Sequence, residues 1–172
     1  MKNGKNLFKF LAIAVIFLVT YSCFDDPVGE DPINYTPARE AALLSEYLDT
    51  LVNREYDIDT TDLGVYYIVL EAGEGEFAQA GDSIGIDYTG FFPENSSTFD
   101  ASSYHYEDGI WKYIHSSTGL IPGFYDAINH LNKGADVLFV LPSALAYGAT
   151  GYSSIPPYTT IAFRIKLIDI YE

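Results

Sequence analysis

The spacing of hydrophobic and polar positions changes twice along the 172-residue chain. Residues 10–19 form an unbroken apolar run, and residues 36–56 then carry apolar side chains at helical spacing. These helical positions are Ala41, Leu44, Leu48, Leu51 and Val52. From residue 63 onward, short stretches rich in β-branched and aromatic residues follow. The pattern predicts an amphipathic helix followed by a mostly β domain.

Five segments of the β domain carry strand-like patterns. They are residues 65–70, 83–89, 111–114, 136–141 and 160–171. Residues 71–75, with two Gly and two Glu, predict a turn after the first of them. A short helical pattern covers Gly123–Leu131, with apolar residues spaced along one face. Strands with one short helix predict an α+β fold, in which an antiparallel sheet covers that helix.

The long helix has a clear start signal. Thr36 suits the N-cap and Pro37 the first helical position, and the pattern runs through Tyr56. Two interpretations of its apolar stripe are open, namely packing against the following domain and pairing of two chains. We favour packing on its own domain and expect a monomer.

The first 22 residues read as a targeting segment. Lys2, Lys5 and Lys9 precede the apolar run, which is shorter than the about 20 residues of a membrane-spanning helix. The single cysteine, Cys23, follows this run and has no partner for an internal disulfide. These features predict a bacterial lipoprotein signal with Cys23 as the lipidated residue. An ordinary signal peptide with an incidental cysteine is the alternative.

Four regions follow from these patterns. Residues 1–22 are predicted as the signal peptide, 23–35 as an acidic flexible tether, 36–62 as the N-terminal helix with a linker, and 63–172 as the folded domain. The expected location is the bacterial cell envelope, where the lipid on Cys23 anchors the chain to the outer membrane. The periplasmic and surface sides of that membrane both remain open.

Composition excludes several classes of protein. The net charge is −15, and the six basic and 24 acidic residues that follow Cys23 give −18. Such a surface repels phosphates, so no nucleic-acid partner is expected. His105, His115 and His130 lack metal-ligand spacing, and Ser143 lacks the setting of a hydrolase nucleophile. No metal or cofactor is expected.

Three segments together carry a more specific signal. They are Asp87-Tyr88-Thr89-Gly90 with Phe99-Asp100, then Leu120-Ile121-Pro122-Gly123-Phe124, and finally Ala146-Tyr147-Gly148 with Ile155-Pro156-Pro157 and Thr160–Phe163. In this order and at these separations, they resemble the FKBP-type peptidyl-prolyl cis-trans isomerases. The resemblance covers residues 63–172 and implies an antiparallel half-barrel wrapped around one short helix, with the active pocket between them.

The resemblance also implies roles for individual residues. The catalytic set would be Tyr88, Phe99, Asp100, Tyr147 and Phe163. The substrate-binding set would be Trp111, Leu120, Ile121, Phe124 and Ile155. Phe124 would form the pocket floor, the Ile121 backbone N–H would anchor a substrate carbonyl, and Asp100 and Tyr147 would be the polar groups beside the bound peptide. Each aromatic residue taken singly is equally compatible with a core position.

The implied function is isomerisation of X–Pro bonds in exported, proline-containing polypeptides, as a folding helper. One alternative is a module that binds prolyl or unfolded segments without significant turnover. Another is a structural lipoprotein that recruits a partner through its acidic surface and helix. The loops at 102–108 and 152–155 depart from the family pattern in length, which leaves the preference for residues next to proline open.

Overall fold

Helix α1 covers Pro37–Asn53 in the computed structural model, which describes residues 33–171. The Thr36 hydroxyl accepts a hydrogen bond from the Arg39 N–H (3.2 Å), as expected of an N-cap. The helix ends three residues earlier than the sequence predicts. Arg54 caps it, and Glu55 adopts a left-handed conformation (φ 64°) that turns the chain away.

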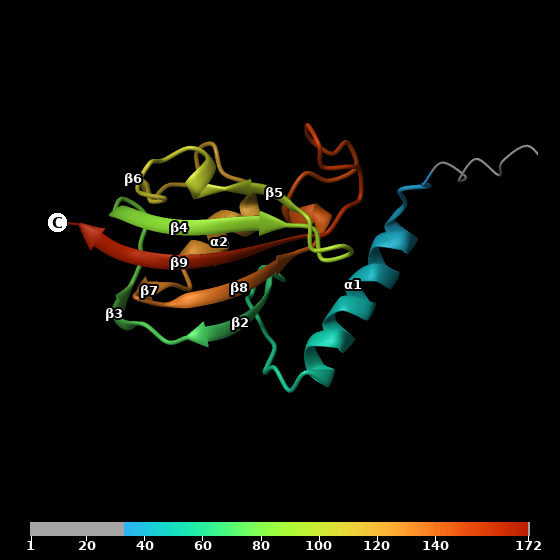
Figure 1. Ribbon diagram of the computed structural model, residues 1–172, viewed down its shortest axis with the longest axis horizontal. Coiled ribbons are helices and arrows are strands. Elements are labelled where there is room, and N and C mark those ends of the chain that lie inside the picture. Colours follow the sequence, from blue (N-terminus) through green and yellow to red (C-terminus); the bar gives the residue numbers. More distant parts are fainter. Residues whose placement is uncertain (1–32, 172) are drawn as a thin grey trace, which may run out of the picture. The chain divides into compact units, whose positions relative to one another are not determined.

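The main sheet has seven strands, paired antiparallel throughout (Figure 1). Its order is β1 (Asp59–Thr60), β2 (Tyr66–Glu71), β8 (Asp136–Leu141), β9 (Ile161–Tyr171), β4 (Ser83–Phe91) and β5 (Thr98–Ala101), with β6 (Trp111–Ile114) also on β4. A separate two-stranded sheet joins β3 (Glu74–Phe77) to β7 (Asn132–Lys133). The predicted α+β class and antiparallel sheet are confirmed.

The predicted turn at residues 71–75 is only partly correct. Ala72 and Gly73 turn the chain, whereas Glu74 and Gly75 already belong to β3. The strand forms because β7 lies beside it, and the partner is almost 60 residues away in the sequence. The local sequence alone does not predict the pairing of β3 with β7.

Helix α2 (Pro122–Ile128) lies against one face of the sheet and closes the core. It stops three residues before the predicted end, in tight turns through Leu131. Along β9, Ile161, Phe163, Ile165 and Leu167 face this core, and from Phe163 onward they alternate with the more exposed Arg164 and Lys166. The alternation is the period-2 pattern of a half-buried strand.

Strands β5 and β6 share one edge of β4 and leave a gap between them. β6 pairs with Ser83–Ile86 and β5 with Thr89–Phe91, so neither strand covers the backbone at Tyr88. The fully buried Ser102, which opens the short 3-10 helix η1 (Ser102–Tyr104), fills this gap. Its hydroxyl accepts a hydrogen bond from the Tyr88 N–H (3.0 Å) and lies 2.9 Å from Asp87 Oδ1. The Ser102 side chain thereby replaces the strand-to-strand backbone hydrogen bond that is missing at Tyr88.

Helix α1 crosses the end of the sheet where β4 and β8 finish and β9 begins (Figure 1). It contacts its own domain, since Glu40 hydrogen bonds to Ser143 and Thr160, and Leu51 is buried. Two of its predicted apolar-face positions, Ala41 and Val52, are exposed instead. None of the helices within residues 33–171 has the length and apolar composition that crossing a membrane requires.

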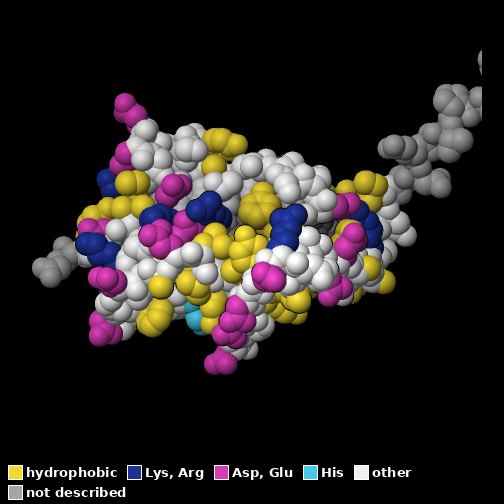
Figure 2. All heavy atoms as spheres, turned by 60° about the horizontal axis from the view of Figure 1, so that its bottom comes forward, with side chains coloured by type: hydrophobic (Ala, Val, Ile, Leu, Met, Phe, Trp, Pro, Cys, Tyr) yellow, Lys and Arg dark blue, Asp and Glu magenta, His cyan; other side chains and the backbone are white. Residues whose placement is uncertain are grey.

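Most of the basic side chains in the described part of the chain lie in ion pairs. The pairs are Arg39–Glu94, Lys112–Asp108, Lys133–Asp169, Arg164–Asp136 and Lys166–Glu71. Figure 2 shows Lys and Arg groups lying among Asp and Glu groups on one face of the molecule. Because acids are in large excess, many of them remain as uncompensated negative charge at the surface.

Candidate active site

A pocket of about 480 Å³ lies between α2 and the sheet, on the side of the β5–β6 gap. It is lined by Tyr88, Asp100, Trp111, Gly119, Leu120, Ile121, Phe124, Tyr147, Tyr152 and Phe163. These residues come from β4, β5, β6 and β9, from α2 and its leading turn, and from the segment between β8 and β9. The lining residues, which are spread between positions 88 and 163 of the sequence, therefore form one pocket.

The floor of the pocket is a set of aromatic rings that meet mainly edge to face. We call Tyr88, Trp111, Phe124 and Phe163 the aromatic floor. Tyr88 meets each of the other three rings at centroid distances of 5.9 to 6.2 Å, and Phe124 meets Phe163 at 4.9 Å. Edge-to-face contacts of this kind stabilise aromatic pairs beyond their buried area. The result is a packed aromatic surface.

Gly90 is required by the packing beside this floor. A Cβ atom at Gly90 would lie 2.7 Å from ring atoms of both Phe163 and Phe99. These two rings are themselves edge to face at a centroid distance of 5.6 Å, and Phe92 also contacts Phe99, at a centroid distance of 5.1 Å. The missing side chain at position 90 therefore leaves room for the contact between Phe99 and Phe163.

The polar side of the pocket is centred on the Asp100 carboxylate. Tyr88 donates its phenolic proton to Oδ2 (2.9 Å), while the Ala101 N–H donates to Oδ1 (2.9 Å). The His105 Nε2 atom also lies 2.7 Å from Oδ1. Both oxygens are therefore held in place before any ligand arrives.

Burial raises the pKa of the Tyr88 phenol well above its ordinary value, and the hydrogen bond to Asp100 adds to the effect. Burial also raises the pKa of Tyr147, with further contributions from Asp100 and Tyr152. In each case the cause is the same, because a phenolate would be poorly solvated and would lie near a carboxylate. Both phenols are therefore neutral donors throughout the neutral range.

The rim of the pocket lies on the segment between β8 and β9, residues 142–160, which we call the pocket loop. It begins with the 3-10 helix η2 (Ser143–Leu145) and carries Tyr147 and Tyr152, whose rings stack at 5.4 Å. Tyr152 is 67% exposed, so the rim faces solvent. Tyr152 and Ile155 bond to each other's backbone across the tip of the loop.

Eight of the ten residues predicted for the pocket line it. The other two, Phe99 and Ile155, are not among the lining residues: Phe99 is partly buried and packs against Phe163, and Ile155 lies in the core. Gly119, Tyr152 and His105 were not predicted. His105 carries no periodic signal and bonds to Asp100 only because η1 folds back over β5.

Cys23 lies outside the described residues. Within residues 33–171, no cluster of three or more potential metal ligands is present.

Comparison with known proteins identifies the family of the chain. The family model described as FKBP-type peptidyl-prolyl cis-trans isomerase matches residues 74–168, which is more than half of the chain. The chain belongs to this family.

The relatives are longer proteins. The FKBP-type isomerase FkpA of Escherichia coli K12 is 32% identical over 117 residues, which cover 68% of this chain and 42% of FkpA. The FKBP-type 22 kDa isomerase of the same strain is 29% identical over 126 residues, or 73% of this chain and 58% of that protein. The chain thus spans less than two thirds of either relative.

Two solved structures share the fold. The crystal structure of FkpA from Escherichia coli aligns with a TM-score of 0.62 at 27% identity, covering 77% of this chain and 61% of FkpA. The N-terminal domain of FKBP42 from Arabidopsis thaliana gives 0.60 at 17% identity, covering 67% and 93%. The second likeness concerns the fold alone.

Proposed function

We propose that the protein is a peptidyl-prolyl cis-trans isomerase that acts on proline-containing polypeptides. The observation that carries the proposal is the pocket itself, in which an aromatic floor meets a Tyr88–Asp100 pair whose hydrogen bonds are already made. Membership of the isomerase family and the names of FkpA and the 22 kDa relative support the same function.

The chemistry of the reaction fits a pocket of this composition. Rotation about the X–Pro bond has a barrier of about 20 kcal/mol, because amide resonance is lost when the bond twists. The twisted amide is less polar than either planar isomer, so an apolar surrounding disfavours the planar forms more than the transition state. The floor residues Tyr88, Trp111, Phe124 and Phe163 supply this surrounding to the prolyl ring.

The polar groups have positioning roles in this proposal. Asp100 orients the flanking peptide and Tyr147 donates a hydrogen bond to it, while the Ile121 backbone N–H holds a substrate carbonyl at the start of α2. Both Asp100 oxygens are already engaged, and the phenols of Tyr88 and Tyr147 hold their protons tightly. Proton transfer is therefore not part of the mechanism.

A protease-coupled assay with a short prolyl peptide tests the proposal directly. The protease cleaves only the trans isomer, so the slow phase reports the rate of isomerisation. We expect the chain to accelerate this phase in proportion to its concentration. A peptide that binds, as seen by fluorescence of the single tryptophan Trp111, but isomerises at the uncatalysed rate would point to the alternative of a binding or chaperone module.

We further propose that Cys23 carries a lipid and anchors the domain to the bacterial cell envelope. The support comes from the charged residues, apolar run and single cysteine of the first 23 residues. Labelling of cells with a fatty-acid analogue should tag the wild type and leave Cys23→Ser untagged. Equal labelling of both would contradict the anchor.

We also propose a monomer. The support is that α1 directs Glu40 and Leu51 toward its own domain. Sedimentation of a chain from residue 25 onward should give the monomer mass, and a dimer that dissociates when residues 37–56 are removed would contradict this.

A further inference from the structure

The first turn of α1 contacts both ends of the pocket loop. Glu40 accepts hydrogen bonds from the Ser143 N–H (2.5 Å) and the Ser143 hydroxyl (2.6 Å), at the beginning of the loop. Its Oε1 atom also accepts one from the Thr160 hydroxyl (3.0 Å), at the end of the loop. One carboxylate thus holds two points that lie 17 residues apart in the sequence.

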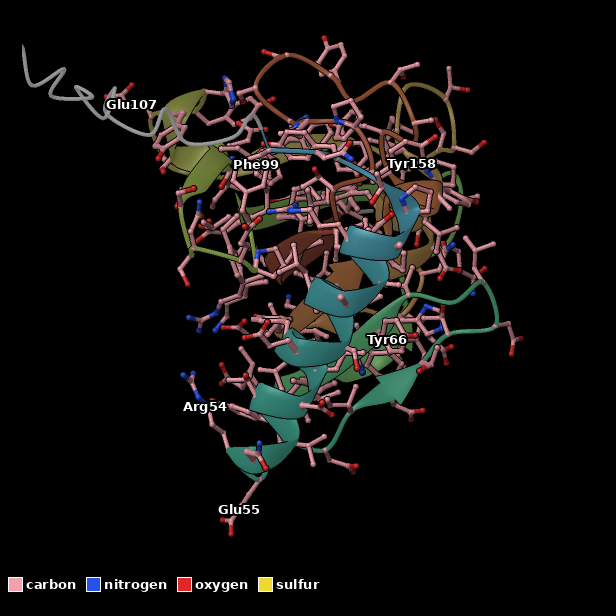
Figure 3. All side chains as sticks on the ribbon, turned by 90° about the vertical axis from the view of Figure 1, so that its right-hand side faces the viewer. Arg54, Glu55, Tyr66, Phe99, Glu107 and Tyr158 are labelled. Atoms are coloured by element: carbon pink, nitrogen blue, oxygen red, sulfur yellow. The ribbon has the colours of Figure 1, made fainter. Side chains whose placement is uncertain are left out.

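These contacts are shielded from water. Ser143 and Thr160 are 5% and 8% exposed, and Glu40 is itself half-buried. A cavity of only about 30 Å³ remains between the first two turns of α1 and the residues around Phe92 and Tyr158. In Figure 3, Tyr158 lies near the N-terminal end of α1. Hydrogen bonds to a carboxylate in such a place are stronger than those at the open surface.

Ser143 transmits this contact to the rim of the pocket. Its carbonyl oxygen accepts hydrogen bonds from the backbone N–H groups of Ala146 (2.9 Å) and Gly148 (2.8 Å). The Gly148 carbonyl in turn accepts one from the Tyr158 N–H (2.9 Å). Tyr147 stands between Ala146 and Gly148, so its backbone is fixed by bonds that lead to Glu40.

Arg39 makes a second contact from the same turn, to the other side of the pocket. Its guanidinium pairs with Glu94 at 2.6 Å, in the connection that leads from β4 to Phe99 and Asp100 on β5. This pair is partly exposed to solvent, and pairs of that kind contribute little stability. The Glu40 contact, which is the more buried of the two, is therefore the dominant one.

We propose that Glu40 is a positioning residue, through which α1 holds the pocket loop and its Tyr147 in the conformation that binds substrate. The consequence for substrate rests on the isomerase function proposed above, whereas the holding of the loop does not. If the loop were free, its ordering would have to occur during binding, and affinity would fall by that cost.

Hydrogen exchange of the backbone amides in the full chain tests the holding of the loop. Glu40→Gln keeps the size of the side chain and removes its charge, and Glu46→Gln on the exposed side of α1 is the matched control. The Gly148 and Tyr158 amides should exchange about tenfold faster in Glu40→Gln than in the wild type, since a neutral amide with one acceptor oxygen replaces a charged carboxylate with two and the bonds from Ser143 and Thr160 weaken. The β4 and β9 amides should match those of Glu46→Gln.

A double-mutant cycle provides a second measurement. Ser143→Ala removes one of the three bonds, so Glu40→Gln and Ser143→Ala together should accelerate Gly148 exchange by less than the product of their separate factors. Equal exchange in Glu40→Gln and wild type, an equal rise throughout β4 and β9, or simple additivity of the two substitutions would each overturn the proposal.

Binding and turnover of a prolyl peptide separate this inference from the proposed function. We expect Glu40→Gln to raise KM three- to tenfold with kcat changed less than twofold, and Glu46→Gln to behave as wild type. A fall in kcat at unchanged KM would overturn the positioning role. A wild type that neither binds nor isomerises the peptide would refute the isomerase function, while the exchange data would still decide the contact between Glu40 and the pocket loop.

Discussion

The aromatic floor of the pocket consists of side chains from β4, β6, β9 and α2, whereas the rim consists of side chains from the pocket loop. Floor residues are embedded in the core, with Phe124 and Phe163 each only 5% exposed. Rim residues such as Tyr147 depend on a few hydrogen bonds within the loop and on Glu40. Changes in the floor should therefore affect both folding and activity, and changes in the rim should mainly affect substrate binding.

The largest effect is expected for Phe163→Ala. Removing a buried phenylalanine costs about 3–5 kcal/mol of unfolding free energy and here also opens the floor to water. Urea unfolding followed by circular dichroism measures the first effect, and the coupled isomerase assay at a temperature where the variant is folded measures the second. Phe163→Leu, which fills most of the volume, should lose less of both. Full activity in a folded Phe163→Ala would contradict the role of the floor.

The next effect is expected for Asp100→Ala. Tyr88 would lose the acceptor of its buried hydroxyl, and an unsatisfied buried donor costs about 1–3 kcal/mol. Catalytic efficiency (kcat/KM) should also fall about tenfold, or about 1.4 kcal/mol of transition-state stabilisation, because Tyr88 and the flanking peptide lose the group that positions them. Asp100→Asn retains an acceptor for Tyr88 and should recover most of the loss. An Asn variant as impaired as the Ala variant would show that the charge of Asp100 is itself required.

A smaller effect is expected for Tyr147→Phe. The ring keeps the rim closed, and only one hydrogen bond to substrate is lost, worth about 0.5–1.5 kcal/mol net or roughly a two- to tenfold change in catalytic efficiency. Tyr152→Phe, at the more exposed ring of the stacked pair, should change it by less. If Tyr147→Phe lost more activity than Phe163→Ala, a specific hydrogen bond would dominate catalysis and the apolar floor would be secondary.

The smallest effect is expected for alkaline pH. Burial raises the pKa of Tyr88 and Tyr147, so neither should ionise between about pH 7.5 and 9.5, and catalytic efficiency should change less than about twofold. The folded state retains these protons where the unfolded state begins to release them, near pH 10. Their contribution to stability is therefore complete below about pH 10 and is lost as pH rises further. A steep loss of activity near pH 8.5 would contradict neutral phenols as the required form.

Local rules in the sequence determined a large part of the fold. The start of α1 followed from Thr36 and Pro37, and β6 and β8 followed from their residue types at the observed positions. Eight lining residues of the pocket followed from a family resemblance, because an aromatic pocket requires particular residue types at fixed separations. These signals lie in the linear sequence and do not depend on which distant segments contact one another.

The tertiary structure alone decided how the site is supported. Ser102 replaces a missing strand bond, His105 reaches Asp100 from η1, and Glu40 bonds to residues 103 and 120 positions away. None of these polar residues belongs to a periodic pattern, and each is equally compatible with a solvated loop or an exposed helix face. Their roles arise from tertiary contacts: Ser102 lies at the β5–β6 gap, and Glu40 lies beside the pocket loop. A polar group buried at such a place requires a hydrogen-bond partner.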